Sequence, residues 1–212
     1  MTPISVVIIT YNEEKNMERC LKSIHHLADE IIVVDSYSTD RTEEICRLYG
    51  AKFYQHPFEG HIEQKNYANT LASYPCILSL DADEAPDDTL QASLLETKKN
   101  WQADGYYFNR LTNYCGKWIR HSGWYPDRKL RLFDNRKGKW AGVNPHDRYE
   151  LQKGSTLRYL EGNLLHYSFH SISQHIEQTN KFSTEGAYAL FDRGKKSSTM
   201  KILVKSAAKF VR

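Results

Sequence analysis

The chain has 212 residues, of which 40% are apolar and 26% are charged, and its formal net charge is +3. This length allows one proper hydrophobic core and excludes two full domains. No apolar run approaches the ~20 residues of a membrane-spanning helix, and Met1–Pro3 leads directly into an apolar strand instead of a charged leader. We therefore expect a soluble body with one appendage.

The positive charge is concentrated at the end of the chain. Residues 195–212 contain no acid, which leaves residues 1–194 with a net charge of −3. The basic residues of this tail are Lys195, Lys196, Lys201, Lys205, Lys209 and Arg212. Nucleic-acid-binding domains carry a basic patch on the body itself. We therefore expect no nucleic-acid partner and assign the charge to a separate function of the tail.

The cysteines indicate the redox environment. Cys20, Cys46, Cys76 and Cys115 are scattered without metal-type spacing, and the first three lie in apolar surroundings. This pattern is typical of a reducing compartment, which predicts a cytoplasmic protein.

Residues 1–100 alternate between strand and helix patterns. The β-branched apolar run at 4–10 is typical of a strand buried on both faces, and the run at 30–35 repeats it. We expect strands at 4–10, 30–35, 51–54 and 76–80, separated by helices at 13–26, 41–49 and 62–72. This βα alternation predicts a mostly parallel sheet flanked by helices.

Three of these strands end in polar or acidic segments, which are Thr10–Glu13, Asp35–Ser36 and Asp81–Asp83. Ligands of such sheets bind at the carboxyl ends of the strands, so we expect a polar pocket there. No glycine-rich phosphate loop follows the first strand, which disfavours a dinucleotide fold, a P-loop and nucleotidyl transfer.

The cluster Asp81-Ala82-Asp83-Glu84 allows two interpretations. Its carboxylates are suited to a divalent cation that holds a phosphate. Alternatively, the cluster is a solvated acidic turn that caps a helix beginning near Pro86. The polar ends of the neighbouring strands favour the cation.

From residue 104 the chain becomes rich in aromatic residues and alternates in polarity, as at 106–108, 129–133 and 164–169. We expect mixed or antiparallel strands that extend the sheet. Aromatic side chains of this half are predicted to wall one side of the pocket, with core packing as the alternative. They are Trp118, Trp124, Tyr125 and Trp140.

The tail is predicted to form a basic amphipathic helix. Its apolar residues recur at helical spacing: Met200, Leu203, Val204, Ala207 and Val211. Lys201, Lys205 and Lys209 form a stripe on another face. Such helices bind anionic membrane surfaces, and the alternative is packing on the body or on a second subunit.

Four ordered segments resemble the family 2 glycosyltransferases, whose nucleotide-binding half has the GT-A arrangement. They are Ser5–Glu13, Ile32–Asp40, Gln64–Ala68 and Leu78–Glu84. The resemblance implies a Rossmann-like GT-A fold with a nucleotide-sugar-binding half at 1–100 and an acceptor-binding half at 101–170. A C-terminal helical region at 171–212 would follow.

Within that family the chain looks most like small bacterial glucosyltransferases of lipopolysaccharide-core or related cell-surface glycan assembly. The segments that carry this similarity are Trp124–Asp127, Arg131–Phe133 and Asn144–Asp147. It implies transfer of a hexose, glucose from UDP-glucose, to a lipopolysaccharide-core or other membrane-associated glycan at the inner face of the plasma membrane. The alternative is a non-catalytic nucleotide-binding or membrane-docking module with the same fold.

The resemblance also implies roles for residues of the donor site. Thr10, Tyr11 and Glu13 would line the base and ribose, and Asp35 would accept a hydrogen bond from the uracil ring. Lys65 would lie near the phosphates as a compact cation. Its alternative is an ordinary surface lysine.

A divalent metal is part of the same expectation. Asp83 would ligate Mg²⁺ or Mn²⁺ on the diphosphate, and Asp81 would reach the ribose or the metal. His166, on an expected strand, would add a nitrogen ligand, and a satisfied core histidine is the alternative.

Chemistry in this family is direct displacement with inversion at the anomeric carbon. The resemblance implies that Asp147 is the base, because His146-Asp147 resembles a His-Glu pair of related transferases. The shorter side chain of aspartate keeps Glu84 and Asp127 as reserve candidates.

Three residues are predicted to contact the acceptor: Trp124, Arg128 and Arg131. The arginines would grip acidic groups, and the alternative is ordinary strand-surface charge. For Asp147 the alternative is a surface ion pair with Arg148 or Arg128.

Overall fold

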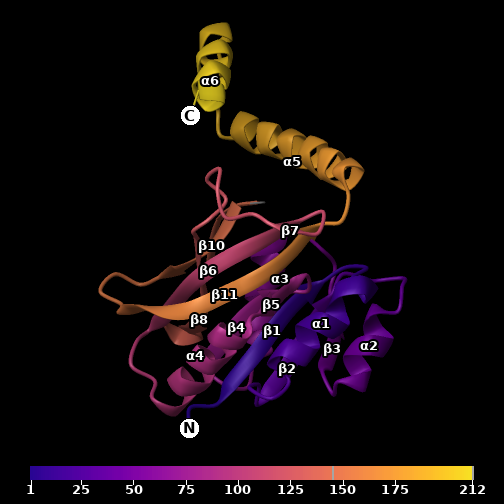
Figure 1. The fold of residues 1–212 in the computed structure, drawn as a ribbon, viewed down its shortest axis with the longest axis vertical. Coiled ribbons are helices and arrows are strands. Elements are labelled where there is room, and N and C mark those ends of the chain that lie inside the picture. Colours follow the sequence, from indigo (N-terminus) through magenta and orange to yellow (C-terminus); the bar gives the residue numbers. More distant parts are fainter. Residues whose placement is uncertain (145, 212) are drawn as a thin grey trace.

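A curled mixed sheet forms the centre of the molecule (Figure 1). The computed structural model describes residues 1–144 and 146–211. Pro145 of the Asn144–Asp147 motif and Arg212 of the basic tail lie outside these residues. The side chains of His146, Lys209 and Val211 also lie outside the described part.

The first half of the chain forms the parallel part of the sheet, in the order β3-β2-β1-β4. Its strands are β1 (Ile4–Thr10), β2 (Glu30–Asp35), β3 (Lys52–Gln55) and β4 (Cys76–Asp81). Its helices are α1 (Glu14–Ile24), α2 (Thr42–Leu48) and α3 (His61–Thr70). The predicted fold class is confirmed, with small shifts at the ends of elements.

The second half extends the sheet in the order β8-β6-β11-β5, and β8 pairs antiparallel with β4. Its strands in this sheet are β6 (Gly105–Tyr114), β7 (Lys117–Trp118), β8 (Asp127–Asp134) and β11 (Leu157–Phe169), and the edge strand β5 (Glu84–Pro86) comes from the first half of the chain. The mixed sheet was expected, but β6 and β11 run parallel to each other. This is possible because β8 and a separate hairpin lie between them in the chain.

Helix α4 (Asp88–Lys99) begins slightly later than the sequence indicates. Pro86 belongs to β5, where it pairs with Leu164 of β11. The helix is capped by Asp87, whose side chain accepts a hydrogen bond from the backbone N–H of Leu90 at 2.8 Å. The acids of the 81–84 cluster therefore do not cap this helix.

Alternation along the strands creates two cores on opposite faces of the sheet. Val6 and Ile8 of β1 pack toward α1, α2 and α4, whereas Val7 packs toward α3. Three cysteines, Cys20, Cys46 and Cys76, are buried as expected, and Cys115 is exposed.

A separate hairpin, β9 (Gly138–Val143) and β10 (His146–Leu151), docks on α3 after the short 3₁₀ turn η1 (Asn135–Lys137). Asn66 of α3 donates to the carbonyl of Trp140 at 2.9 Å and accepts from its N–H at 3.0 Å. The side chain of Asn144 accepts from the N–H of Ile62 at 3.1 Å. The hairpin is thus fixed to the helix through backbone groups.

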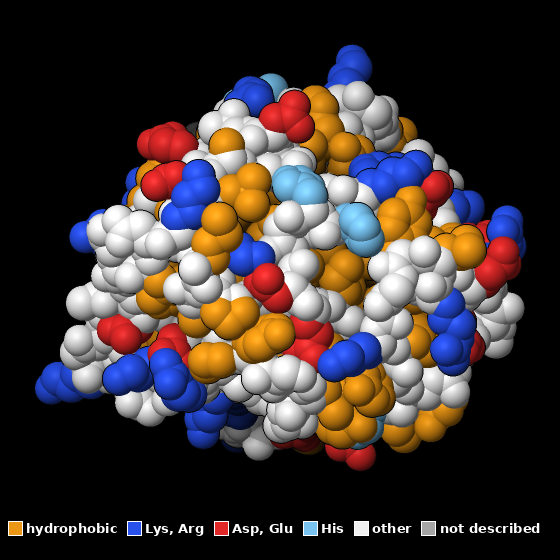
Figure 2. Space-filling view, turned by 90° about the horizontal axis from the view of Figure 1, so that it is seen from below, with side chains coloured by type: hydrophobic (Ala, Val, Ile, Leu, Met, Phe, Trp, Pro, Cys, Tyr) orange, Lys and Arg blue, Asp and Glu red, His pale blue; other side chains and the backbone are white. Residues whose placement is uncertain are grey.

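Helices α5 (Ile172–Asp192) and α6 (Thr199–Val211) extend away from the sheet (Figure 1). In the described part of the chain, no helix is both long and apolar enough to cross a bilayer. On the face of the body shown in Figure 2, acidic and basic side chains are interspersed with apolar ones.

Candidate active site

The carboxyl ends of three parallel strands meet at one rim of the sheet. In the strand register Thr10 lies beside Asp35, and Ile9 lies beside Asp81. The polar segments that follow β1, β2 and β4 therefore lie side by side, as the sequence predicts. Thr10 and Asp35 are buried, whereas Asp81 is partly exposed. This rim is the candidate site.

Ser38 joins the loops that follow β1 and β2. Its hydroxyl donates to the carboxylate of Asp35 and accepts from the backbone N–H of Asn12 at 2.7 Å. Its own N–H donates to Asp35 at 2.8 Å. Asn12 has a φ of +53°, a conformation that asparagine tolerates better than most residues. Asp35, the predicted uracil acceptor, therefore also sets the shape of this loop.

Thr10 and Tyr11, predicted to line the base and ribose, differ in environment. The hydroxyl of Thr10 is buried and has no hydrogen-bond partner among the described residues. Such groups are rare in native proteins, so a bound polar group is a fitting partner for it. The side chain of Tyr11 is 59% exposed, which leaves a ring face for stacking.

Glu13 lies close to the acids of the site. Burial raises the pKa of Glu13 to about 7, while a hydrogen bond from Asn16 acts in the opposite direction. The negative charges of Asp83, Asp40 and Asp81 raise it further. The rim is therefore rich in negative charge on this side.

Lys65 is buried between two carboxylates, although an exposed surface lysine was the alternative. Its Nζ lies 3.0 Å from Oδ1 of Asp81 and 2.9 Å from Oδ2 of Asp147. Its side chain is only 3% exposed, and Nζ lies 4.6 Å from the ring centroid of Trp140. Helix α3 thus places one cation between the end of β4 and the hairpin strand β10.

Asp81 has a second cationic partner. Nη2 of Arg131 lies 2.9 Å from Oδ2 of Asp81 and 3.2 Å from Oε1 of Glu84. Burial alone would raise the pKa of Asp81, but Lys65 and Arg131 hold it well below its usual range. Burial likewise opposes the charge of Arg131, and Glu84 and Asp81 raise its pKa above the ordinary value.

Asp83 and His166, two predicted metal ligands, face each other. Nε2 of His166 lies 3.2 Å from Oδ2 of Asp83. Burial alone would lower the pKa of His166, but the Asp83 carboxylate raises it. One carboxylate and one imidazole form a donor set that fits Mn²⁺. Asp81 contacts the two cations instead, and no group of three candidate ligands gathers within residues 1–144 and 146–211.

The three predicted acceptor residues lie in different environments. Trp124 makes edge contacts with the rings of Tyr114 and His175. Arg128 is exposed at the start of β8 and lies 5.7 Å from the ring of Tyr107. Arg131 is buried and contacts Asp81 and Glu84, as described above.

The predicted aromatic wall is also dispersed. Trp140 contacts Lys65, as described, whereas Trp118 packs edge-on against Tyr167 with ring centroids 5.2 Å apart. The hydroxyl of Tyr125 donates to Asn163 at 3.0 Å.

The two reserve candidates for the base, Glu84 and Asp127, are buried or paired with basic side chains. Glu84 is 0% exposed. Asp127 accepts from Arg110 at 3.0 Å and pairs with Lys129 at 3.0 Å. Asp147 keeps 13% of its side chain exposed, and its partner is Lys65 instead of Arg148 or Arg128.

The comparisons with known proteins agree with this geometry. The model of the family described as Glycosyl transferase family 2 matches residues 5–193. The chain belongs to glycosyl transferase family 2. It is therefore a transferase enzyme.

Relatives extend this assignment along the chain. A glycosyltransferase of Rickettsia typhi is 31% identical over 95% of this chain and 73% of its own length. The lipopolysaccharide core biosynthesis glycosyltransferase LpsC of Rhizobium meliloti is 28% identical over 99% of this chain and 80% of its own. The crystal structure of S. aureus TarS superposes with a TM-score of 0.54 and 17% identity, covering 87% of this chain and 65% of that one. This last likeness shows the shared fold.

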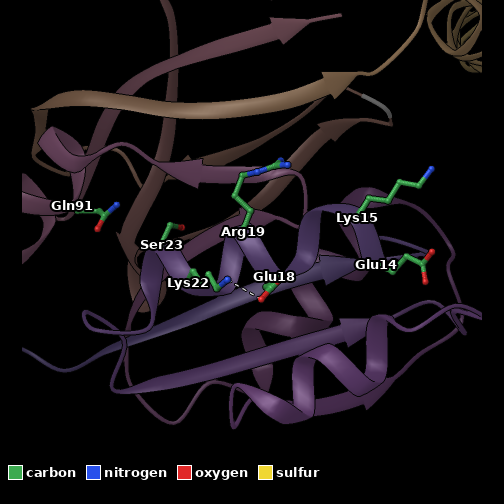
Figure 3. Close-up of a pocket in the computed structure, with 7 residues that line it drawn as sticks. All are labelled: Glu14, Lys15, Glu18, Arg19, Lys22, Ser23 and Gln91. Atoms are coloured by element: carbon green, nitrogen blue, oxygen red, sulfur yellow. Dashed lines mark ion pairs between the residues drawn. The ribbon is translucent and has the colours of Figure 1, made fainter. Parts of the chain in front are cut away.

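A hollow of about 530 Å³ lies beside α1 of this family 2 glycosyltransferase (Figure 3). It is lined by Glu14, Lys15, Glu18, Arg19, Lys22, Ser23 and Gln91. Glu18 and Lys22, one turn apart on α1, form an exposed ion pair in its wall at 2.8 Å. Its wall contains none of the predicted donor, metal or base residues.

Two features of the site of this glycosyltransferase were missed from the sequence. One is the contact of Arg131 with both Asp81 and Glu84, and the other is the role of Ser38 in holding Asp35. The first had no local signal, because it depends on strand register. The second had one: serine three residues after aspartate is typical of a side-chain-capped turn.

Proposed function

We propose that this enzyme transfers a hexose from a UDP-sugar, with UDP-glucose as the first candidate, and inverts the anomeric configuration. The acceptor is a lipopolysaccharide-core or another membrane-associated glycan. The observation that carries the proposal is the position of Lys65 between Asp81 and Asp147. Through this one side chain, the carboxyl end of β4, where the donor is proposed to bind, is connected to the predicted base.

The chain's own residues divide the reaction between them. Thr10, Tyr11, Glu13 and Asp35 bind the uridine, as their positions on the rim support. Asp83 and His166 would hold a divalent ion, which would supply charge stabilisation to the departing diphosphate when bound. Lys65 adds a positive charge at the same place.

Asp147 acts on the acceptor side. The acceptor hydroxyl oxygen bonds to the anomeric carbon as the bond from that carbon to the diphosphate oxygen breaks. Asp147 takes the hydroxyl proton, and UDP leaves with the bonding electron pair. Asp147 suits this role because it is partly exposed, whereas Glu84 is fully buried.

The relatives and the tail support the proposed acceptor class. The relative LpsC is named for lipopolysaccharide core biosynthesis, and it aligns over 99% of this chain. Trp124 and Arg128 remain our candidates for contact with the acceptor. We place the enzyme in the cytoplasm, at the inner face of the plasma membrane.

Helices α5 and α6 are the proposed membrane contact. They expose large apolar side chains, including Ile176, Phe191 and Leu203 at 57%, 77% and 64%. Residues 195–212, which include α6 and the linker before it, contain lysines and no acidic residue. Apolar surface beside basic charge matches an anionic lipid interface.

A thermal-shift series tests donor and metal together. UDP-glucose, UDP-galactose, UDP-N-acetylglucosamine and GDP-mannose are each added with and without Mn²⁺. We expect only the UDP compounds to raise the melting temperature, and to do so more with Mn²⁺; a ligand at 100 times its Kd adds about 2.7 kcal/mol. No shift with any UDP compound would contradict the proposal.

A transfer assay separates the enzyme from a non-catalytic module. Labelled glucose is followed from UDP-glucose onto a truncated lipopolysaccharide core, and the anomeric configuration of the product is read by NMR. Transfer with inversion supports the proposal. UDP binding without turnover of any donor would instead indicate a nucleotide-binding module.

A further inference from the structure

Glu84 has an environment unlike that of the two aspartates before it. It is 0% exposed, and its Oε2 accepts a hydrogen bond from the backbone N–H of Asp81 at 3.0 Å. Its Oε1 lies 3.2 Å from Nη2 of Arg131 and 3.6 Å from Nη1 of Arg110. A buried carboxylate requires such partners, because an unpaired one is strongly destabilising. Glu84 therefore closes the turn from inside the protein.

Arg131 reaches this turn because of an irregularity in β8. Along β6, Tyr106 pairs with Leu132 and the next residue, Tyr107, pairs with Leu130. Arg131 is therefore the extra residue of a bulge, which redirects a side chain relative to the regular alternation. Its Nη2 contacts both Glu84 and Asp81.

The turn is also held to the far strand. Glu84 pairs with His166 in the register of β5 and β11, and the carbonyl of Asp83 accepts from the N–H of Tyr167 at 2.9 Å. The residues on both sides of the turn are therefore fixed to the neighbouring strands. The Asp81 carboxylate is oriented by Lys65 and Arg131, and the Asp83 carboxylate faces His166.

We propose that Glu84, together with Arg131, is a positioning residue that holds Asp81 and Asp83 in the orientation needed to bind the donor. The inference rests on the proposed function. Glu84 sets the backbone of the turn through the N–H of Asp81. Arg131 sets the side chain of Asp81 through its carboxylate. Both residues are assigned to act through Asp81 and not by direct contact with the substrate.

The decisive comparison is between Glu84→Gln and Glu30→Gln. Glutamine has one acceptor oxygen, so at position 84 it cannot serve both the N–H of Asp81 and Arg131. Glu30 is an equally buried carboxylate with a 4% exposed side chain, paired with Lys52 at 2.6 Å. It lies at the start of β2, at the opposite end of that strand from Asp35. The two substitutions therefore remove similar buried charges at different distances from the site.

UDP binding is measured by calorimetry with and without Mn²⁺, next to the melting temperature of each variant. We expect both substitutions to lower the melting temperature. Only Glu84→Gln is expected to weaken UDP binding in Mn²⁺, by about tenfold, the lower end of the range for residues that orient ligands. Glu30→Gln should bind UDP within about twofold of the wild type.

Affinity of Glu84→Gln within about twofold of the wild type would overturn the inference, as would equal losses in both variants. If Glu84→Gln does not fold, Arg131→Lys replaces it, because a lysine ammonium lacks the forked geometry that bridges two acids. Unchanged UDP affinity of Arg131→Lys would then overturn it. If the wild-type protein binds no UDP compound with Mn²⁺ or Mg²⁺, the proposed function is overturned as well. The wild-type control therefore distinguishes failure of the proposed function from failure of this inference alone.

Discussion

Lys65 and Asp147 form a buried ion pair between two elements that are far apart in the chain. Nζ of Lys65 lies 2.9 Å from Oδ2 of Asp147, and 82 residues separate them. The same ammonium lies 3.0 Å from Asp81. One ammonium group thus pairs with a carboxylate of the sheet and with a carboxylate of the hairpin.

Replacing Lys65 by methionine should be strongly destabilising, because it leaves two partly buried carboxylates without this cation. We expect a loss of about 3–5 kcal/mol in the free energy of unfolding, measured by urea denaturation. The control is Lys99→Met, whose side chain is 55% exposed in its surface pair with Glu96 and which should lose at most about 1 kcal/mol. Equal losses in the two variants would show that the ion pairs of Lys65 stabilise the fold no more than the control pair does.

Asp147→Asn should abolish most turnover while sparing the donor. We expect kcat to fall by about 10²–10⁴, the range for loss of a general base, with UDP affinity changed only a few-fold. Asp127→Asn is the matched control, because Asp127 is also paired with basic side chains and was a reserve candidate. If Asp127→Asn loses turnover and Asp147→Asn keeps it, the base has been assigned to the wrong residue.

His166→Ala should reduce the effect of the metal on donor binding. Removing the imidazole leaves Asp83 without its neighbour at 3.2 Å. The factor by which Mn²⁺ raises UDP affinity should therefore be smaller than in the wild type by about tenfold or more. The control is His170→Ala, an exposed histidine just beyond the same strand. A titration of UDP at several Mn²⁺ concentrations measures the difference, and identical metal dependence of both variants would exclude His166 as a ligand.

Glu13 should make the unliganded protein less stable as the pH rises. Its pKa is raised by burial from an ordinary value near 4.5 to about 7, so the folded state keeps a proton that the unfolded chain has released. This contribution is fully present below about pH 4.5 and is lost as the pH rises through 7. Relative to the wild type, Glu13→Gln should gain stability across that interval.

Melting temperatures at pH 4.5, 6 and 8 check this expectation. The control is Glu59→Gln, which removes an exposed glutamate from a loop. A difference between Glu13→Gln and the wild type that does not grow with pH would contradict the assignment.

The tail lysines should control membrane affinity without affecting the donor site. Changing Lys195, Lys196, Lys201 and Lys205 to glutamine removes about 1 kcal/mol of attraction per lysine at an anionic surface. We expect binding to phosphatidylglycerol vesicles in a sedimentation assay to fall at least tenfold. UDP affinity should stay the same.

A second quadruple variant controls for net charge alone. Lys15, Lys117, Lys137 and Lys153 are exposed on the body, and their change to glutamine should leave vesicle binding largely intact. Equal losses in the two variants would indicate unspecific electrostatics, and binding that survives the tail substitutions would contradict a lysine-dependent contact.

The parallel half of the fold could be predicted because its signals are local. Runs such as 4–10 and 30–35 are apolar on both faces, and each ends in a polar segment that shows where the strand stops. Because parallel strands share a direction, the clustering of Thr10, Asp35 and Asp81 followed from their order in the chain. Asp83 and His166, both expected to hold a metal ion, lie close together, and their role as ligands stays a prediction.

The remainder depends on long-range pairing that has no local signature. The parallel pairing of β6 and β11 and the bulge at Arg131 arise from register between distant strands. For this reason the contact of Arg131 with Asp81 could not be predicted from the sequence. The burial of Lys65 likewise requires the hairpin at 138–151, whose docking onto α3 cannot be derived from the α3 sequence alone.

Because the hairpin docks on α3, the proposed base and the proposed uridine site belong to different elements and can change separately in evolution. Lys65 and Asn66 are neighbours on α3, and one pairs with Asp147 while the other holds Trp140. The proposed base is therefore held through α3, whose Lys65 also contacts Asp81 of β4. In the proposed mechanism, insertions or exchanges at the hairpin tip alter the surroundings of Asp147 and leave unchanged the segments after β1 and β2, which are proposed to bind the uridine.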